Sequence, residues 1–252
     1  MTDLMAGVAV TFLLLAAIFM IQAGRANAAA QHEAERARSV VKKTETRDID
    51  VRKRLRDLGE KIGPIAKIDD HDPFLLVVTF QAVQWFETGQ CDLVPAVVRN
   101  IQDKVVPVFK TVCASQASDI DSIVLEGHTD PMPFIDGSKR CGAVDLCLTG
   151  NPVTCAETGF RNNVRLSAAR AQEVFFEARK EIESTDHELI RSCLDKYVVV
   201  AGRGPADTLT GADWRQVKEL AQLSKETLQK DRRVILKVRY RSPRLVADEA
   251  PP

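Results

Sequence analysis

The segment from Leu4 to Ile21 is an uninterrupted run of uncharged residues. At about 1.5 Å of rise per residue, a helix of this length spans roughly 27 Å, close to the hydrocarbon thickness of a bilayer. A cleaved signal peptide, with Ala26-Asn27-Ala28 as its cleavage site, is the alternative interpretation. We favour a retained span, because no Lys or Arg precedes Leu4 and the run is longer than a usual signal core. Residues 1–22 are therefore the expected transmembrane helix.

Two sequence rules disagree about the orientation of this span. Arg25, Arg36 and Arg38 follow it, which by the positive-inside rule would place the rest of the chain in the cytoplasm. The chain also holds six cysteines, and disulfides persist only in an oxidising compartment. We give the cysteines more weight and expect a cytoplasmic N-terminus with the remainder outside the membrane. Lys+Arg and Asp+Glu are equal at 35 each, so no basic excess indicates nucleic-acid binding.

Asp3 stands directly before the span, where a polar residue at the membrane interface is the simplest interpretation. Gly7 and Thr11 follow it at steps of four, so the three residues share one face of a helix. Small residues on a helix allow close packing against partner helices. A carboxylate on such a face would be buried in protein and could bind and release a proton.

Residues 23–63 are predicted to form a helical, coiled-coil linker. From Ala30 to Ile62, alternate steps of four and three meet apolar residues at eight of ten positions. Because each copy would be tethered to the membrane at the same end, we expect a parallel homodimer. The alternative, a helix packed on its own domain, has equal weight until Val51, where larger side chains begin. Gly63-Pro64 is expected to end the helix.

The remainder of the chain alternates short apolar runs with helical patterns. The predicted strands are residues 75–80, 122–127, 197–202 and 233–240, and the predicted helices are 93–109, bent at Pro107, and 164–183. Strands separated by helices predict an α/β sandwich in which helices pack on a mixed sheet. Residues 242–252 are expected to be a flexible tail.

Five segments resemble, in family order, the OmpA-like peptidoglycan-binding domains, and together they cover about residues 73–241. They are WFETGQCDL (85–93), IVLEGHTD (123–130), NVRLSAARA (163–171), GRGP (202–205) and DRRV (231–234). The resemblance implies that Asp130 and Arg170 bind the diaminopimelate of the cell-wall peptide, with Thr129 and Asn163 assisting. An Asp suits the ammonium of that residue, and an Arg suits its carboxylate bidentately. The alternative is that Asp130 and Arg170 simply pair with each other.

The chain departs from this family in two places. Asp130 and Arg170 are 40 residues apart, much farther than the family usually places them. The excess predicts a long loop over Pro131–Phe160, beside the expected site. The second departure is Asp231, where the family commonly has Asn and where an added negative charge could alter the site.

The cysteines are predicted to form up to three disulfides, whose connectivity is open because six cysteines allow fifteen pairings. A zinc site with His128 is disfavoured. The cysteines of the loop predicted over Pro131–Phe160 have the spacing C-x5-C-x7-C, which lacks a CxxC pair. We expect no metal and no cofactor, and the absence of a nucleophile–base pattern argues against an enzyme. The six residues are Cys91, Cys113, Cys141, Cys147, Cys155 and Cys193.

The whole layout, an Asp before a span, a helical linker and an OmpA-like domain, resembles the B subunits of ion-driven stators. Named members are MotB of the flagellar motor and ZorB of the Zorya anti-phage system. The resemblance implies a single-pass protein of the bacterial inner membrane with a periplasmic C-terminal domain, in which Asp3 carries the ion. It also implies a homodimer inside a pentamer of MotA- or ZorA-like membrane subunits. We favour a Zorya-like motor, because the span lacks the Trp typical of flagellar members. A flagellar stator subunit and a static wall tether without ion transport are the alternatives.

Overall fold

A computed structural model describes residues 2–241 apart from 88, 115–118, 133–151, 185–187, 214 and 217–221. The side chains of residues 2–14, 16 and 152–154 also lie outside the described part. The chain divides into two compact units, one holding the residues up to Asp50 and one running from Val51 to Arg241. Each unit is described by itself.

Helix α1 runs from Thr2 to Ile62 and confirms that the predicted linker over 23–63 is helical as far as Ile62. It ends as expected, because Gly63 adopts a positive φ of 92° and donates its N–H to the carbonyl of Gly59. Where side chains are described, no helix has both the length and the apolar character needed to cross a bilayer. For most residues of the predicted span, Leu4–Ile21, the side chain is outside the described part.

The predicted coiled-coil seam behaves differently before and after Asp50. In the first unit, Val40 and Val41 are 51% and 55% exposed in the single chain, and their pairing with a second copy stays a prediction. Val51, Leu55 and Leu58 are buried and belong to the hydrophobic core of the second unit. For these residues the structure favours the alternative, a helix packed on its own domain. Their large side chains bury enough apolar surface to explain the difference from the alanines before them.

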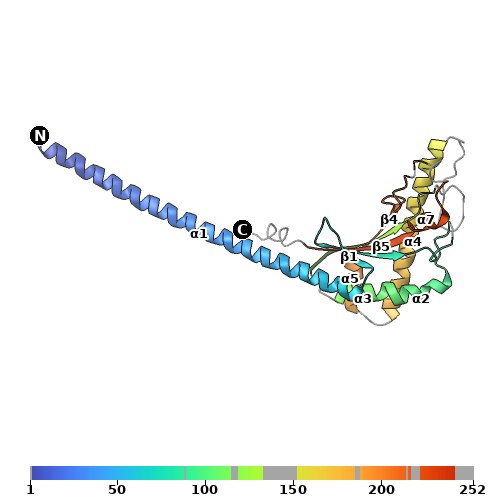
Figure 1. Cartoon of the computed structure of the whole chain (residues 1–252). Coiled ribbons are helices and arrows are strands. Elements are labelled where there is room, and N and C mark those ends of the chain that lie inside the picture. Colours follow the sequence, from blue (N-terminus) through green and yellow to red (C-terminus); the bar gives the residue numbers. More distant parts are fainter. Residues whose placement is uncertain are drawn as a thin grey trace. The chain divides into compact units, whose positions relative to one another are not determined.

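A five-stranded sheet forms the centre of the second unit (Figure 1). Its order is β1-β2-β5-β3-β4, and only the β3–β4 pair is parallel, so the sheet is mixed as predicted. All four predicted strands are present, while β1 was not predicted because three residues leave too little pattern. The strands are β1 (Ala66–Ile68), β2 (Leu75–Gln81), β3 (Ile120–His128), β4 (Val198–Gly204) and β5 (Arg233–Tyr240).

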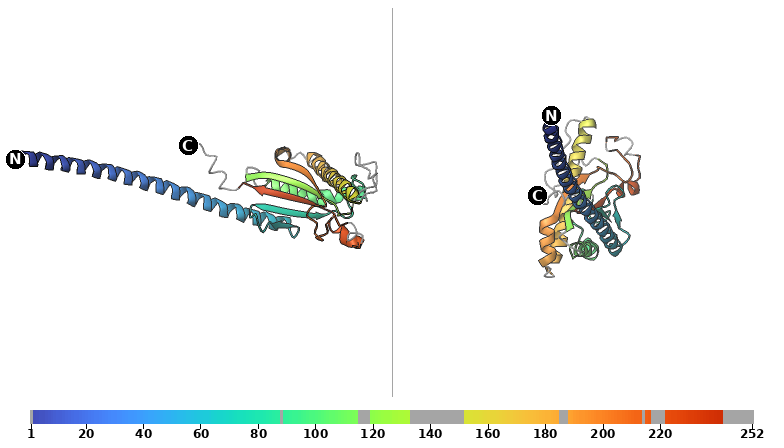
Figure 2. Two further views of the ribbon diagram at one scale, coloured as in Figure 1. Left: turned by 90° about the horizontal axis from the view of Figure 1, so that it is seen from above. Right: turned by 90° about the vertical axis from the view of Figure 1, so that its left-hand side faces the viewer.

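Helices pack against this sheet, which confirms the predicted α/β class; Figure 2 shows α4 alongside the strands. The expected bend at Pro107 takes the form of a π-helical segment, η2 (Ile101–Val105). Pro107 has no N–H to donate one turn back, so the regular helical bond is lost at this point. The other helical segments are η1 (Pro95–Val97), α2 (Val98–Asn100), α3 (Val106–Ala114), α4 (Pro152–Ser184), α5 (Glu188–Tyr197) and α7 (Lys225–Gln229).

The predicted loop over Pro131–Phe160 is wrong in its last part. Residues Pro152–Phe160 form the first turns of α4, so this helix begins twelve residues before Val164, where the sequence pattern had started it. Pro152 suits the first position of a helix, because its fixed φ is helical and its missing N–H would have no partner there. Residues 133–151 lie outside the described part of the chain.

The strand directions bring several loops to one edge of the sheet. β2 and β3 are both antiparallel to β5, and β4 is parallel to β3, so β2, β3 and β4 end at the edge where β5 begins. We call this the carboxyl edge. It consists of residues 82–87 and 89–90, 129–132, 204–210 and 231–233.

Helix α4 lies directly on the backbone of β3 and β4. A Cβ at Gly127 would overlap the carbonyl oxygen of Ser167, and one at Gly202 would overlap that of Val164. The Ser167 hydroxyl also accepts a hydrogen bond from the Gly204 N–H at 2.8 Å. The small residues of three matched motifs therefore fix how α4 sits on the sheet, and with it the side chains that α4 carries to the carboxyl edge.

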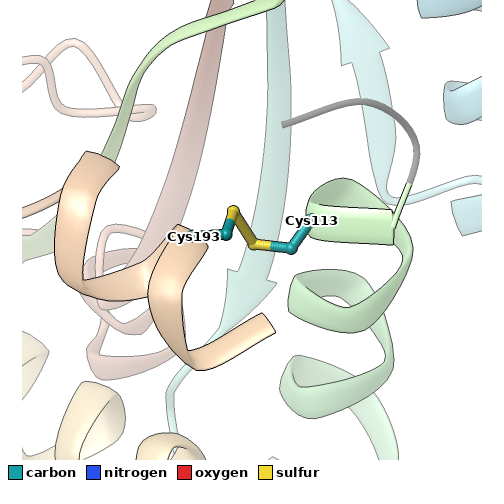
Figure 3. The surroundings of a disulfide bond; sticks show 2 residues. All are labelled: Cys113 and Cys193. Carbon is teal, nitrogen blue, oxygen red and sulfur yellow. A yellow bond between two sulfur atoms is a disulfide. The ribbon is translucent and has the colours of Figure 1, made fainter. Parts of the chain in front are cut away.

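A disulfide joins α3 to α5 through Cys113 and Cys193, which are 80 residues apart in sequence (Figure 3). This pair confirms the prediction of disulfides and supplies the connectivity that the sequence left open. In the chain-entropy view, a bond that closes so long a loop stabilises the folded state by about 4.5 kcal/mol.

The close approach of α4 yields a test by a pair of matched substitutions. We expect Gly127→Ala to lower the free energy of unfolding by about 1–3 kcal/mol, because the methyl group must push α4 away from β3. Gly59→Ala, in α1, meets only the Leu76 side chain at 3.6 Å and should stabilise the protein by about 0.5–1 kcal/mol. Urea unfolding of both variants measures the difference, and equal midpoints would contradict the packing described.

Candidate functional site

Asp130 lies at the carboxyl edge, two residues after the end of β3, and is 8% exposed. Its Oδ2 accepts a hydrogen bond from Nε of Arg232 at 2.6 Å, and its Oδ1 accepts one from the backbone N–H of Met132 at 3.1 Å. Within the described part of the chain, Asp130 therefore pairs with Arg232 and not with Arg170, contrary to the alternative that the sequence left open.

Asn163 and Thr129 flank Asp130. Nδ2 of Asn163, on α4, donates to the carbonyl of Met132 at 2.7 Å, so the Met132 backbone connects Asn163 to Asp130. The backbone N–H of Thr129 donates to the carbonyl of Gly204. Thr129 is 3% exposed, and its hydroxyl oxygen has no hydrogen-bond partner among the described residues.

Arg170 lies two turns after Asn163 on α4 and contacts a loop of the carboxyl edge. Nε donates to the carbonyl of Gln90 at 2.9 Å and Nη2 to that of Glu87 at 3.1 Å. Its guanidinium carbon stands 5.0 Å from the ring centroid of Phe86. The matched motif WFETGQCDL thus forms the loop that Arg170 holds. The structure joins Asp130 and Asn163 through Met132, whereas Arg170 contacts Phe86, Glu87 and Gln90.

Arg232 is the residue at this edge that the sequence analysis missed. The matched segment DRRV contained it, and the signal was an arginine directly before a strand whose neighbours end at the same edge. Neither composition nor spacing shows which acidic residue such an arginine meets, because that depends on the pairing of β5 with β3.

Asp231 has a structural role at the carboxyl edge. It is fully buried, its Oδ2 accepts from the Thr210 hydroxyl at 2.7 Å, and its Oδ1 accepts from the Thr210 N–H at 3.2 Å. Its Oδ1 also stands 3.9 Å from Nη1 of Arg233. The Asp231 carboxylate therefore holds the turn after β4.

Glu126 is a nearly buried carboxylate on β3, surrounded by cationic groups. Its Oε2 stands 2.8 Å from Nζ of Lys237 and 3.5 Å from Nε2 of His128, and its Oε1 lies 4.0 Å from Arg203. Burial alone would raise the pKa of Glu126. Hydrogen bonds from His128 and Lys237, with the charges of Lys237 and Arg203, outweigh burial and lower this pKa to about 2.

His128 links the end of β3 to the turn that follows β4. Its Nδ1 lies 3.3 Å from the carbonyl oxygen of Ala206 and its Nε2 lies 3.5 Å from Oε2 of Glu126, and both oxygens can accept a hydrogen bond from the ring. These contacts are those of a structural residue. Among the residues that the structure describes, no group of three or more His, Cys, Asp or Glu could hold a metal ion.

Several predicted residues are placed only in part. Cys91 carries a buried thiol, and Cys155 is disulfide-bonded. Cys141 and Cys147 lie outside the described residues. Asp3 lies within α1, but its side chain is not described, so its role as ion carrier stays a prediction.

No protein-family profile matches the sequence, and no curated protein matches it. The structure is similar to the cell wall anchor of the T6SS from Pseudomonas aeruginosa at 16% identity and a TM-score of 0.41, over 70% of this chain and 89% of that one. It is similar to a putative MotB like protein from Desulfovibrio vulgaris at 15% identity and a TM-score of 0.41, over 81% and 95%. The periplasmic domain of Helicobacter pylori MotB shares 12% identity at a TM-score of 0.45, over 74% and 85%.

The lowered pKa of Glu126 predicts a specific acid dependence of stability. A carboxyl whose folded pKa is depressed stabilises the protein above its unfolded pKa, here 4.5, and loses that contribution as the pH falls towards 2. We expect Glu126→Gln to lower the free energy of unfolding by roughly 3 kcal/mol at pH 7 and by almost nothing near pH 2. Urea unfolding at several pH values measures this, and a pH-independent difference would contradict it.

Proposed function

We propose that residues 73–241 bind peptidoglycan at the carboxyl edge, with Asp130 receiving the ammonium of diaminopimelate. The observation that carries the proposal is the placement of Asp130, a nearly buried carboxylate held at this edge by Arg232 and the Met132 N–H. A carboxylate offers about four acceptor positions, and these two bonds use two of them. The others suit the N–H donors of an ammonium group.

The surroundings of Asp130 support a binding role over a purely structural one. Its carboxylate is already fixed in orientation, so a ligand would not have to order it, which favours affinity. Asn163 holds the backbone of Met132, which in turn orients Asp130. Through Gly127 and Gly202, the same α4 contact that shapes this edge brings Asn163 and Arg170 to it.

We further propose that the chain is the B subunit of an ion-driven stator in the bacterial inner membrane, as a homodimer within a ring of MotA- or ZorA-like subunits. The support is the order of parts: Asp3 before an uncharged run, an exposed helix and a wall-binding domain. An ion that crosses 100 mV releases about 2.3 kcal/mol per charge, which the ring would convert to rotation while the periplasmic domain stays fixed. A Zorya-like defence motor is our first hypothesis, with a flagellar stator and a static tether as alternatives.

Asp130→Asn tests the wall site. This variant keeps the shape of the side chain but removes its charge, so we expect several-fold less of the full chain to sediment with purified peptidoglycan sacculi. Asp121→Asn is the matched control, because Asp121 is an exposed aspartate near the other end of β3. Equal sedimentation of Asp130→Asn, Asp121→Asn and the unsubstituted chain would remove the proposed site.

Asp3→Asn tests the stator role. The substitution removes the ionisable group and should abolish the motor-dependent activity of cells that carry the chain with its membrane partner. Membrane insertion and sedimentation with sacculi should remain unchanged, because neither needs this carboxylate. Full activity of Asp3→Asn cells would favour the static tether.

A further inference from the structure

We propose that His128 makes the rigidity of the carboxyl edge depend on pH. When the ring of His128 carries a proton on both nitrogens, it holds the turn after β4, residues 205–210, more firmly to β3 than the neutral ring does. The effect on this turn stands by itself, whereas its consequence for wall binding rests on the proposed peptidoglycan site.

The ring of His128 faces one acceptor with each of its nitrogens. Nδ1 lies 3.3 Å from the carbonyl oxygen of Ala206, and Nε2 lies 3.5 Å from Oε2 of Glu126. A carbonyl and an ionised carboxylate can only accept, and a neutral imidazole has a single N–H. The neutral ring therefore donates to one oxygen and turns a lone pair towards the other, whereas the doubly protonated ring donates to both.

Glu126 stays ionised over the range in which histidine changes its charge. Burial raises the pKa of this carboxyl, but its hydrogen bonds and cationic neighbours lower the pKa to about 2. Histidine is the side chain whose charge ordinarily changes between about pH 5 and 8. A change of charge between these two groups near neutral pH therefore belongs to His128.

The ring is buried, so water cannot replace a missing hydrogen bond. His128 is 4% exposed and Glu126 is 7% exposed. Both ring contacts are longer than the usual N–H···O length of about 2.9–3.0 Å. The ring thus lies between two acceptors without a tight bond to either, and a second proton would strengthen the weaker contact.

Charged groups reach this carboxylate from the neighbouring strands. Oε2 of Glu126 lies 2.8 Å from Nζ of Lys237 on β5, and Oε1 lies 4.0 Å from Nε of Arg203 on β4. Lys237 and the His128 ring share Oε2, and a carboxylate oxygen has a lone pair for each. A second proton on the ring therefore does not have to displace the lysine.

Arg233 stands opposite His128 in the β3–β5 pair. Its Nη1 lies 3.9 Å from Oδ1 of Asp231, and its Nη2 donates to the carbonyl of Asp207 in the turn. The carboxylates and cations around the ring balance, so a second proton meets no excess of positive charge. They are Glu126, Asp207 and Asp231 with Arg203, Arg233 and Lys237, and the pair of Asp130 and Arg232 adds one charge of each sign.

The contact with Ala206 connects the ring to the main chain beside the proposed wall site. The turn follows Gly204, whose carbonyl accepts from the N–H of Thr129, the residue before Asp130. A stronger bond to the Ala206 carbonyl should therefore slow the opening of the turn at mildly acidic pH. This contribution is lost as the pH rises and the ring becomes neutral.

Hydrogen exchange of the full chain in detergent tests the proposal at pH 5.5 and pH 8, on either side of the usual histidine range. The N–H groups of Ala206, Leu209 and Thr210 are hydrogen-bonded, so their exchange reports the opening of the turn. Each rate is divided by that of an unstructured peptide at the same pH, which removes the chemical effect of pH and gives a protection factor. Sedimentation with purified sacculi measures wall binding in the same samples.

His128→Asn keeps a hydrogen-bond donor but cannot change its charge. The matched control is His71→Asn, because His71 is an exposed histidine in the loop between β1 and β2. In the unsubstituted chain and in His71→Asn, we expect the turn to be protected at least about threefold more at pH 5.5 than at pH 8, and sedimentation to be at least about twofold greater. In His128→Asn both quantities should be equal at the two pH values.

Equal protection at the two pH values in the unsubstituted chain would overturn the proposal without any variant, and so would a pH dependence that persists in His128→Asn. If His128→Asn does not fold, His128→Gln takes its place. Equal sedimentation at both pH values would overturn the effect on wall binding. If nothing sediments at either pH while the protection still depends on pH, the proposed wall site is wrong and the role of His128 in the turn is supported.

Discussion

The contact between α4 and the backbone of β3 and β4 is the constraint on which the second unit depends. Gly127 and Gly202 leave no room for a side chain, so α4 meets the sheet at main-chain distance around residues 164–168. Asn163 and Arg170 reach the carboxyl edge because the helix that carries them cannot shift outward without losing this contact. The side chains of the proposed binding site are therefore positioned by two glycines, Gly127 and Gly202, which let the helix pack closely on the sheet.

The residues of the matched motifs therefore divide into two kinds. Gly127, Ser167 and Gly202 serve packing, while Asp130 and Arg232 place opposite charges at the edge. The sequence predicted the fold class and the four longer strands, because both depend on local periodicity. It did not predict that Asp130 meets Arg232, because 102 residues separate them and only the register of β5 on β3 joins them.

The linker shows a second limit of pattern reasoning. A seam of apolar residues at steps of four and three is equally suited to a second helix and to the helix's own domain. Val51, Leu55 and Leu58 pack into the core of the second unit, so these three positions of the seam are not available to a partner chain. Likewise, the start of α4 at Pro152 was missed because its first turns carry mixed polar and apolar residues without a clear apolar face.

The Cys113–Cys193 bond has a consequence for how the domain could be damaged. The covalent ring that it closes contains β3, α4 and the residues Asp130, Asn163 and Arg170. A protease that cleaves the chain once anywhere inside this ring would leave both fragments on a single molecule. In an oxidising compartment such a nicked protein would keep all its parts together, and only a reductant would let the halves separate.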